Sequence, residues 1–160
     1  MGNFEAMTPC IKLLKKRKIP YTLHQYTHDK TTPSYGKEAI EKLGVEAERV
    51  FKTLVVSVDG GLVVAVVPAL LMLNMKLLAK TMGKKKATMA ETVMVEKTTG
   101  YLLLGGVSPL AQKKRLPTFI DSSASDFETI YVSAGKRGLE VELSPHDLSA
   151  LTDGVFEALC

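Results

Sequence analysis

Lys52 is the residue of this sequence whose type and position most strongly suggest chemistry. It stands near the start of an apolar run, Phe51 to Val58, that has the β-branched composition of a strand. Strict alternation places Lys52 on the same face as Leu54 and Val56, and we expect that face to be buried. An ammonium group at the margin of an apolar face must extend to solvent, pair with an acid, or bind a ligand. Periodicity alone leaves these three possibilities open.

Two glycine-containing segments farther along the chain have compositions suited to binding oxygen atoms. Gly105 and Gly106 precede Val107-Ser108-Pro109, and their backbone amides can receive a carbonyl oxygen or a phosphate. Residues 133–138 lie between two strand-like runs and combine a hydroxyl, two cations and two glycines, which suits a phosphodiester or a ribose. An ordinary tight turn and a polar hairpin loop explain the same two segments equally well.

The common nucleophile, nucleotide-binding and metal motifs do not occur. No serine sits in a nucleophile elbow, and the three histidines, His24, His28 and His146, are scattered. The two cysteines, Cys10 and Cys160, have no paired spacing, so we expect unpaired thiols. No cluster of ligand residues predicts a metal centre, and no fingerprint predicts a cofactor. Familiar enzyme classes are therefore disfavoured.

The elements that must position these residues form a mixed pattern. Asp59-Gly60-Gly61 between two β-branched runs is a strong hairpin signal, and Thr8-Pro9 and Ser144-Pro145 are typical helix starts. Because hairpins and short helices are mixed instead of repeating as strand–helix units, an α+β domain with a mostly antiparallel or mixed sheet fits best. We expect helices over 9–18, 36–43, 75–82, 90–98 and from 145 onward, and strands over 21–26, 51–58, 62–67, 116–120, 128–133 and 139–143.

Length and hydropathy bound the class of protein. The chain has 160 residues, 46% of them hydrophobic, which fits one domain over residues 1–160 with a real core. The longest apolar stretch, Leu62 to Leu73, contains Pro68 and is shorter than the ~20 residues that a membrane span needs, so no membrane association is predicted. Met1 to Thr8 lacks the pattern of a secretory signal, and the cytoplasm is the expected location.

Positive charge is gathered in short runs. The formal net charge is +4, which weakly favours a polyanionic partner. The runs are Lys15 to Lys18, Lys84 to Lys86, Lys113 to Arg115, and Lys136-Arg137. For any single run, a solvated surface is the simpler interpretation, and only their combination points to nucleic acid.

Four motifs together resemble one family. The sequence is similar to the YbaK/EbsC family of aminoacyl-tRNA deacylases, which is related to the editing domain of bacterial prolyl-tRNA synthetases. The resemblance covers nearly the whole chain in the same order. The motifs that carry it are TPCIKLLKKRKIPYTLHQYTHD (Thr8 to Asp29), FKTLVV (Phe51 to Val56), TGYLLLGGVSPLAQKKRLPTFID (Thr99 to Asp121) and ETIYVSAGKRGLEVEL (Glu128 to Leu143).

The resemblance implies a fold, an activity and a set of site residues. The fold would be a compact α/β domain with a mixed, barrel-like sheet. The activity would be hydrolysis of the ester between a wrongly attached amino acid, cysteine above all, and the terminal ribose of proline tRNA. Carried over by motif, the catalytic set is Lys52, Tyr26, Gly105, Gly106 and Ser133, with Thr53 and Glu140 as substrate-binding neighbours.

The family also implies a mechanism without a protein nucleophile. The substrate's own cysteine thiol or a terminal ribose hydroxyl would participate, while the protein positions and polarises the ester. Lys52 would anchor the substrate, the Gly105 and Gly106 amides would hold the oxyanion, and Tyr26 and Ser133 would orient ribose or amino-acid groups. The acceptor end of tRNA would meet the cations Lys113, Lys114, Arg115, Lys136 and Arg137. Because such a small domain has little surface for reading a whole tRNA, we expect a transient complex with prolyl-tRNA synthetase to add selectivity.

Two other functions fit the same residues. One is a deacylase for alanine or another small amino acid on proline tRNA, because a small pocket separates similar side chains by only ~1–3 kcal/mol per methylene. The other is a non-catalytic module that binds tRNA or a synthetase. Comparing the hydrolysis of cysteinyl- and alanyl-tRNA distinguishes the alanine deacylase from the cysteine deacylase. Salt-sensitive tRNA binding without hydrolysis would identify the non-catalytic module.

Overall fold

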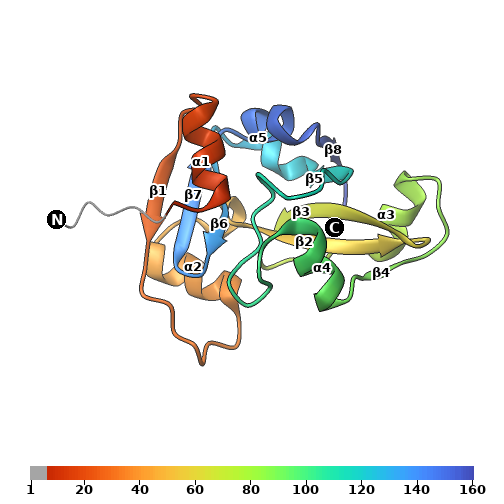
Figure 1. Ribbon diagram of the computed structural model, residues 1–160, viewed down its shortest axis with the longest axis horizontal. Coiled ribbons are helices and arrows are strands. Elements are labelled where there is room, and N and C mark those ends of the chain that lie inside the picture. Colours follow the sequence, from red (N-terminus) through yellow and green to blue (C-terminus); the bar gives the residue numbers. More distant parts are fainter. Residues whose placement is uncertain (1–6) are drawn as a thin grey trace.

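Two β-sheets with short helices packed around them make up the computed structural model, which describes residues 7–160 (Figure 1). Residues 1–6 lie outside the described part. They make up most of the segment Met1 to Thr8, in which the sequence predicted no secretory signal. The elements in chain order are α1 (Pro9–Lys16), β1 (Thr22–Gln25), α2 (Tyr35–Leu43), η1 (Ala47–Arg49), β2 (Phe51–Val58), β3 (Gly61–Pro68), α3 (Met75–Thr81), β4 (Ala87–Met89), α4 (Thr92–Thr99), β5 (Thr118–Asp121), η2 (Ser122–Asp126), β6 (Ile130–Lys136), β7 (Leu139–Leu143), α5 (Pro145–Thr152) and β8 (Val155–Glu157).

The α+β class predicted from the sequence is confirmed. A three-stranded antiparallel sheet has the order β1-β7-β6, and a five-stranded sheet has the order β4-β2-β3-β5-β8. The five-stranded sheet is mixed, because β2 pairs antiparallel with β3 and β4 whereas β3–β5 and β5–β8 pair in parallel. None of the helices in residues 7–160 is long and apolar enough to cross a membrane.

The barrel-like closure expected for the sheet is not found. Among the described residues, the two sheets meet through one isolated parallel bridge between Val50 and Tyr131. Beyond this bridge β2 takes its next partner on the same edge only at Val55, whose carbonyl accepts a hydrogen bond from Ala90 N–H. The edge of β2 between these points is left without a strand partner in the described chain. The sheets therefore diverge around the start of β2 instead of closing.

Apolar side chains pack on both faces of the β2–β3 hairpin. Val56 and Val58 are buried with Leu78 of α3 on one face, as predicted for the face that carries Lys52. On the other face, Val55 joins the main core under α1 and the three-stranded sheet. The hairpin turn has positive φ at Asp59 and Gly60, the conformation that a two-residue turn of this twist requires.

Local signals located the longer elements well and missed the short ones. Thr8 caps α1 by accepting from Ile11 N–H, and Gly44 ends α2 in the left-handed conformation. The strands β4 and β8 were not predicted, because three residues are too few to show a periodicity. The segment predicted as a loop from Ser133 is instead the end of β6, where a bulge between Ser133 and Lys136 interrupts the pairing with β7.

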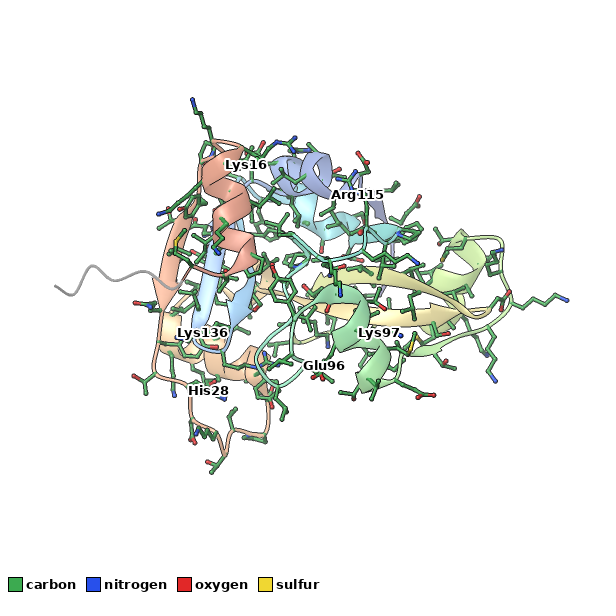
Figure 2. All side chains as sticks on the ribbon, viewed as in Figure 1. Lys16, His28, Glu96, Lys97, Arg115 and Lys136 are labelled. Carbon is green, nitrogen blue, oxygen red and sulfur yellow. The ribbon has the colours of Figure 1, made fainter. Side chains whose placement is uncertain are left out.

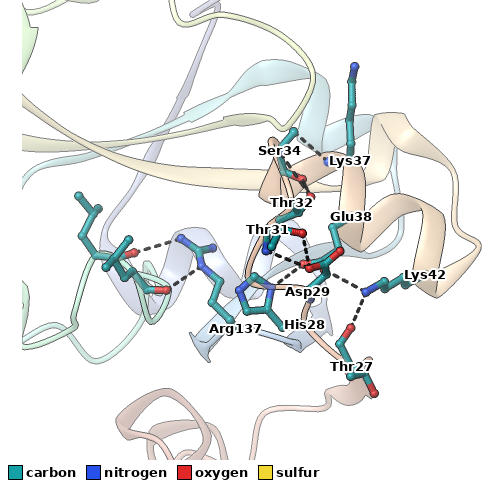
Figure 3. Close-up of polar contacts among 12 residues, drawn as sticks. Thr27, His28, Asp29, Thr31, Thr32, Ser34, Lys37, Glu38, Lys42 and Arg137 are labelled. Carbon is teal, nitrogen blue, oxygen red and sulfur yellow. Dashed lines mark hydrogen bonds and ion pairs between the residues drawn. The ribbon is translucent and has the colours of Figure 1, made fainter.

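A buried carboxylate fixes the connection between β1 and α2. Glu38 of α2 has a side chain that is 3% exposed and accepts hydrogen bonds from the Asp29 backbone at 2.6 Å, His28 Nδ1 at 2.7 Å and Lys42 Nζ at 3.0 Å (Figure 3). Burial alone would raise the pKa of Glu38, but these donors outweigh burial and hold the pKa below its usual range. The chain between Tyr26 and the start of α2 is thereby tied to the helix.

Replacing Glu38 with alanine is expected to lower the free energy of unfolding by about 3 kcal/mol, because it removes the buried acceptor shared by the Asp29 backbone, His28 and Lys42. Glu41→Ala, on the exposed face of the same helix, is the matched control and should change stability little. Urea denaturation of the two variants at pH 7 measures the difference. Equal stability of both variants would contradict the role given to Glu38. The depressed pKa also means that this contribution is lost as the pH falls through the folded-state pKa.

Candidate functional site

A pocket of about 440 Å³ lies where the two sheets diverge. Its wall combines the start of β2, the facing surface of the three-stranded sheet, the first turn of α2 and the loop that follows α4. Six of the residues predicted from the sequence line this one pocket, namely Tyr26, Lys52, Thr53, Ser133, Arg137 and Glu140. Residues far apart in the chain are therefore brought together here. The other lining residues are Ser34, Tyr35, Gly36, Ala39, Val50, Leu54, Ala69, Leu103, Leu104 and Val107.

Lys52 lies on the part of β2 whose edge has no strand partner, and it lines the pocket. In the described part of the chain its ammonium group has no ion-pair partner. Of the possibilities that periodicity left open, pairing with an acid is therefore not observed. The next residue, Thr53, has a hydroxyl oxygen that is buried without a hydrogen-bond partner. Consecutive residues of this strand thus carry a cation and an unsatisfied hydroxyl, and both residues line the pocket.

The opposite wall comes from the three-stranded sheet. Ser133 of β6 and Glu140 of β7 are directly paired, so their side chains lie on the same face of the sheet. The neighbouring residues Val132 and Val141 point to the other face and are buried in the main core. Period-two alternation thus separates a polar wall from an apolar core within the same two strands.

Burial keeps the carboxyl group of Glu140 on this wall neutral. Glu140 is 8% exposed, and desolvation raises its pKa to about 8, with the Arg137 charge opposing the rise. Burial, reinforced by Glu140 and Glu38, also raises the pKa of Tyr26 to about 12. At neutral pH both groups carry their protons and can donate hydrogen bonds into the pocket.

The glycine pair lies beside the pocket but does not line it. Gly106 has φ of 95°, and a Cβ atom there would stand 2.9 Å from Ser133 Oγ, so a side chain does not fit. The amides of Gly105 and Gly106 donate to the carbonyls of Leu102 and Leu103 at 3.0 and 3.3 Å. These amides are engaged within their own turn, and an oxyanion-binding role requires the turn to open.

The predicted basic contacts do not form one surface. Lys113 and Lys114 are exposed outside the pocket, and Arg115 pairs with Asp153 at 2.7 Å. Lys136 borders a separate surface depression beside Gln25 and Thr27. Arg115 and Lys136 lie well apart (Figure 2). Arg137 alone among these cations lines the pocket.

Sequence reasoning missed the contribution of α2 and of the leucines before the glycine pair. Ser34, the N-cap of α2, and Tyr35 line the pocket. Gly36 packs against Ala69 so closely that a Cβ atom would be 2.8 Å from the alanine methyl. Ser34 carried a readable capping signal, but only the tertiary contacts place this helix start at the site.

None of the described residues that line the pocket is an activated nucleophile. The Ser133 hydroxyl accepts from Gly135 N–H at 3.1 Å, and none of the three histidines lines the pocket. Cys10 is a free thiol buried in the main core, and burial raises its pKa to about 11. Within residues 7–160, no group of three His, Cys, Asp or Glu residues is placed to hold a metal ion.

Several known proteins are similar to this chain over most of its length. EbsC of Enterococcus faecalis (strain ATCC 700802 / V583), whose name describes a candidate Cys-tRNA(Pro)/Cys-tRNA(Cys) deacylase, is 40% identical over 153 residues, covering 95% of this chain and 92% of EbsC. A crystal structure described as a candidate trans-editing enzyme for prolyl tRNA synthetase superposes with a TM-score of 0.82 at 20% identity, covering 97% of this chain and 98% of the other.

A second crystal structure, of the hypothetical protein APE2540, superposes with a TM-score of 0.82 at 25% identity, covering 95% of this chain and 99% of the other. Residues 30–151 match the aminoacyl-tRNA editing domain, and this range contains all the pocket residues except Tyr26. The chain belongs to the aminoacyl-tRNA editing domain family.

Proposed function

We propose that this protein is a trans-editing aminoacyl-tRNA hydrolase that removes cysteine from proline tRNA. The name of EbsC, which is 40% identical, supports the substrate, and the match to the editing domain supports the reaction class. The observation that carries the proposal is the ammonium group of Lys52, which has no ion-pair partner among the described residues, in a pocket where Glu140 and Tyr26 carry their protons at physiological pH. Such a pocket attracts the negative charge that develops on an ester oxygen or lies on the terminal phosphate.

The absence of an activated nucleophile from the pocket supports participation by the substrate. An aminoacyl ester is already reactive, so positioning alone can supply a large share of the acceleration. In one route the substrate thiol sulfur bonds to the ester carbonyl carbon, the carbon–oxygen bond to ribose breaks, and the ribose oxygen takes the thiol proton. In the other route a ribose hydroxyl assists attack by water. The protein's part in both routes is to hold the ester beside Lys52.

Replacing Lys52 with alanine is expected to lower kcat/KM for cysteinyl-tRNA(Pro) by at least about 100-fold, because a cation directed at developing charge is lost. Stability should not fall, since Lys52 has no ion-pair partner among the described residues. The measurement is single-turnover deacylation with thermal unfolding of the same samples. Lys37→Ala, on the exposed side of α2, controls for a general loss of positive charge.

A panel of esters tests the proposal as a whole. Proline tRNA carrying cysteine, alanine or serine is incubated with the wild-type protein and with the Lys52→Ala variant. Wild-type-like turnover by the variant would contradict the role of Lys52. A wild-type protein that binds tRNA in a salt-sensitive manner without hydrolysing any ester would instead indicate a binding module.

The two substrate-assisted routes predict different responses to changes in the substrate. If the thiol attacks, alanyl-tRNA(Pro) should be hydrolysed at least about 100-fold more slowly than cysteinyl-tRNA(Pro), because a methyl group cannot replace the nucleophile. If the ribose hydroxyl assists, a terminal 2′-deoxyadenosine should remove most of the activity while alanine remains a substrate. Hydrolysis rates for these three substrates distinguish the routes.

Glu140 is suited to act as a neutral hydrogen-bond donor to the bound ester. It is buried in the pocket, and no protein group in the described residues forms a hydrogen bond with its carboxyl group. A protonated carboxylic acid can donate to an ester or ribose oxygen, whereas its ionised form can only accept. The donor is therefore expected to be lost as the pH rises through the Glu140 pKa of about 8.

Glu140→Gln keeps a neutral donor that does not titrate. The ratio of variant to wild-type kcat/KM should therefore be constant below the Glu140 pKa of about 8 and rise about tenfold per pH unit above it. Taking the ratio cancels titration of the substrate amine, and the rate without enzyme is subtracted at each pH. A ratio that stays flat from pH 6 to 9.5 argues against a protonated Glu140.

The same variant has a stability readout. The folded chain holds the Glu140 proton more tightly than the unfolded chain, so wild-type stability should decline between the ordinary pKa of 4.5 and the raised pKa of about 8. Glu140→Gln lacks this decline, and its advantage over wild type should grow by up to about 5 kcal/mol across that range. Urea denaturation at several pH values measures it.

A further inference from the structure

The segment from Leu102 to Gly106 is held by polar contacts to its backbone and not by burial of its side chains. Leu102 is 66% exposed and Leu104 is 77% exposed, so these apolar side chains contribute little to fixing the segment. Two side chains form hydrogen bonds with its backbone. Glu96 of α4 accepts from Leu103 N–H at 2.9 Å, and the side chain of Arg137 donates to the opposite face of the segment.

Arg137 spans the pocket mouth between this segment and α2. Its Nε donates to the Leu104 carbonyl at 3.1 Å and its Nη2 to the Leu103 carbonyl at 3.0 Å (Figure 3). The guanidinium carbon also lies 3.6 Å from the centroid of the Tyr35 ring. The planar group is therefore stacked on α2 while its edge holds two consecutive carbonyls of the loop.

We propose that Arg137 is a positioning residue that holds the 102–107 segment in place over the pocket. The segment places Leu103, Leu104 and Val107 in the pocket wall and carries the glycine pair beside Ser133. Loss of the arginine fork frees the backbone of Leu103 and Leu104 on the side facing the pocket. The effect on catalysis rests on the proposed deacylase function, whereas the effect on the segment itself does not.

This assignment differs from the phosphate contact that the basic run Lys136-Arg137 suggested. The Nε–Nη2 edge is one of the two edges through which a guanidinium binds phosphate or carboxylate in a two-point contact, and here carbonyl oxygens occupy it. Burial also lowers the pKa of Arg137, in keeping with a group turned toward the protein. Lys136 is exposed on the same hairpin and is not among the residues that line the pocket.

Hydrogen exchange of the wild-type protein and an Arg137→Lys variant tests, without any substrate, whether Arg137 holds the 102–107 segment. We call this contact the Arg137 clamp. Lysine keeps the charge but cannot hold two carbonyls with a planar fork. The amides of Leu103, Gly105 and Gly106, which are hydrogen-bonded in the structure, should exchange at least about tenfold faster in the variant. Amides of β2 and β3 should be unchanged, which shows that the variant is folded. Tyr35→Leu, which removes the stacking surface, should accelerate the same three amides.

A kinetic test uses deacylation of a short RNA helix that has the sequence of the acceptor stem and carries cysteine. Arg137→Lys should lower kcat at least about tenfold while KM changes less, because misplacement of groups around the reacting ester affects turnover more than capture. Lys37→Gln removes a charge from the exposed side of α2 and should stay within about twofold of wild type. Arg137→Gln, which loses both the fork and the charge, should resemble Arg137→Lys in kcat.

Each result bears on the clamp in a defined way. Faster exchange confined to the 102–107 segment supports it even if the wild-type protein hydrolyses no aminoacyl ester, in which case only the proposed function fails. Unchanged exchange in both Arg137→Lys and Tyr35→Leu would overturn it. A second pattern would also overturn the proposal. If Arg137→Lys has a normal kcat and the only defect of Arg137→Gln is a salt-dependent rise in KM, Arg137 contacts a phosphate of the substrate.

Discussion

The bridge between Val50 and Tyr131 is the contact on which the site depends. Both residues are buried, at 2% and 5% exposure, and Arg49 reinforces the junction by reaching Glu142 at 3.1 Å while lying 5.0 Å from the centroid of the Tyr131 ring. If the two sheets paired further along β2, another strand would cover the backbone edge at Lys52 and Thr53, and no pocket would remain between the sheets. Because the sheets meet at one point and then separate, the polar face of β6 and β7 is left opposite an open strand edge.

Two buried glutamates near this junction show how local donors decide protonation. Glu38 has three donors and a lowered pKa, so it remains ionised and ties the β1–α2 connection to the helix. Glu140 has no such donors among the described residues, and desolvation therefore dominates and raises its pKa. Similar burial thus yields one structural anion and one neutral acid. In the resulting pocket the positive charge of Lys52 has no carboxylate paired with it in the described structure.

Local patterns in the sequence were sufficient for the elements and for part of the site. Alternation along 51–58 and the Asp59-Gly60 turn led directly to the β2–β3 hairpin and to the unusual position of Lys52. The inward orientation of Arg137 was not accessible in the same way, because it depends on a bulge in β6 and on a loop thirty-odd residues earlier in the chain. The engagement of the Gly105 and Gly106 amides likewise depends on how the turn folds. Residue type can suggest a hydrogen-bond donor, but only the tertiary structure shows which acceptor that donor binds.

The two substrate-assisted routes of the proposed deacylation would place different demands on this architecture. The apolar wall near Leu54, Leu103 and Val107 can separate small side chains by only ~1–3 kcal/mol per methylene, which is weak discrimination for an editing reaction. Attack by the substrate thiol makes up the difference chemically, because an amino acid without a nucleophile cannot take that route however well it fits. Assistance by a ribose hydroxyl gives no such filter, since every aminoacyl ester carries the same ribose. A correctly attached amino acid would then have to be rejected by shape. Part of the pocket wall is a loop whose leucines are exposed and whose backbone is hydrogen-bonded to Arg137 and Glu96. The less the substrate's own chemistry selects, the more the selectivity must rest on those polar contacts.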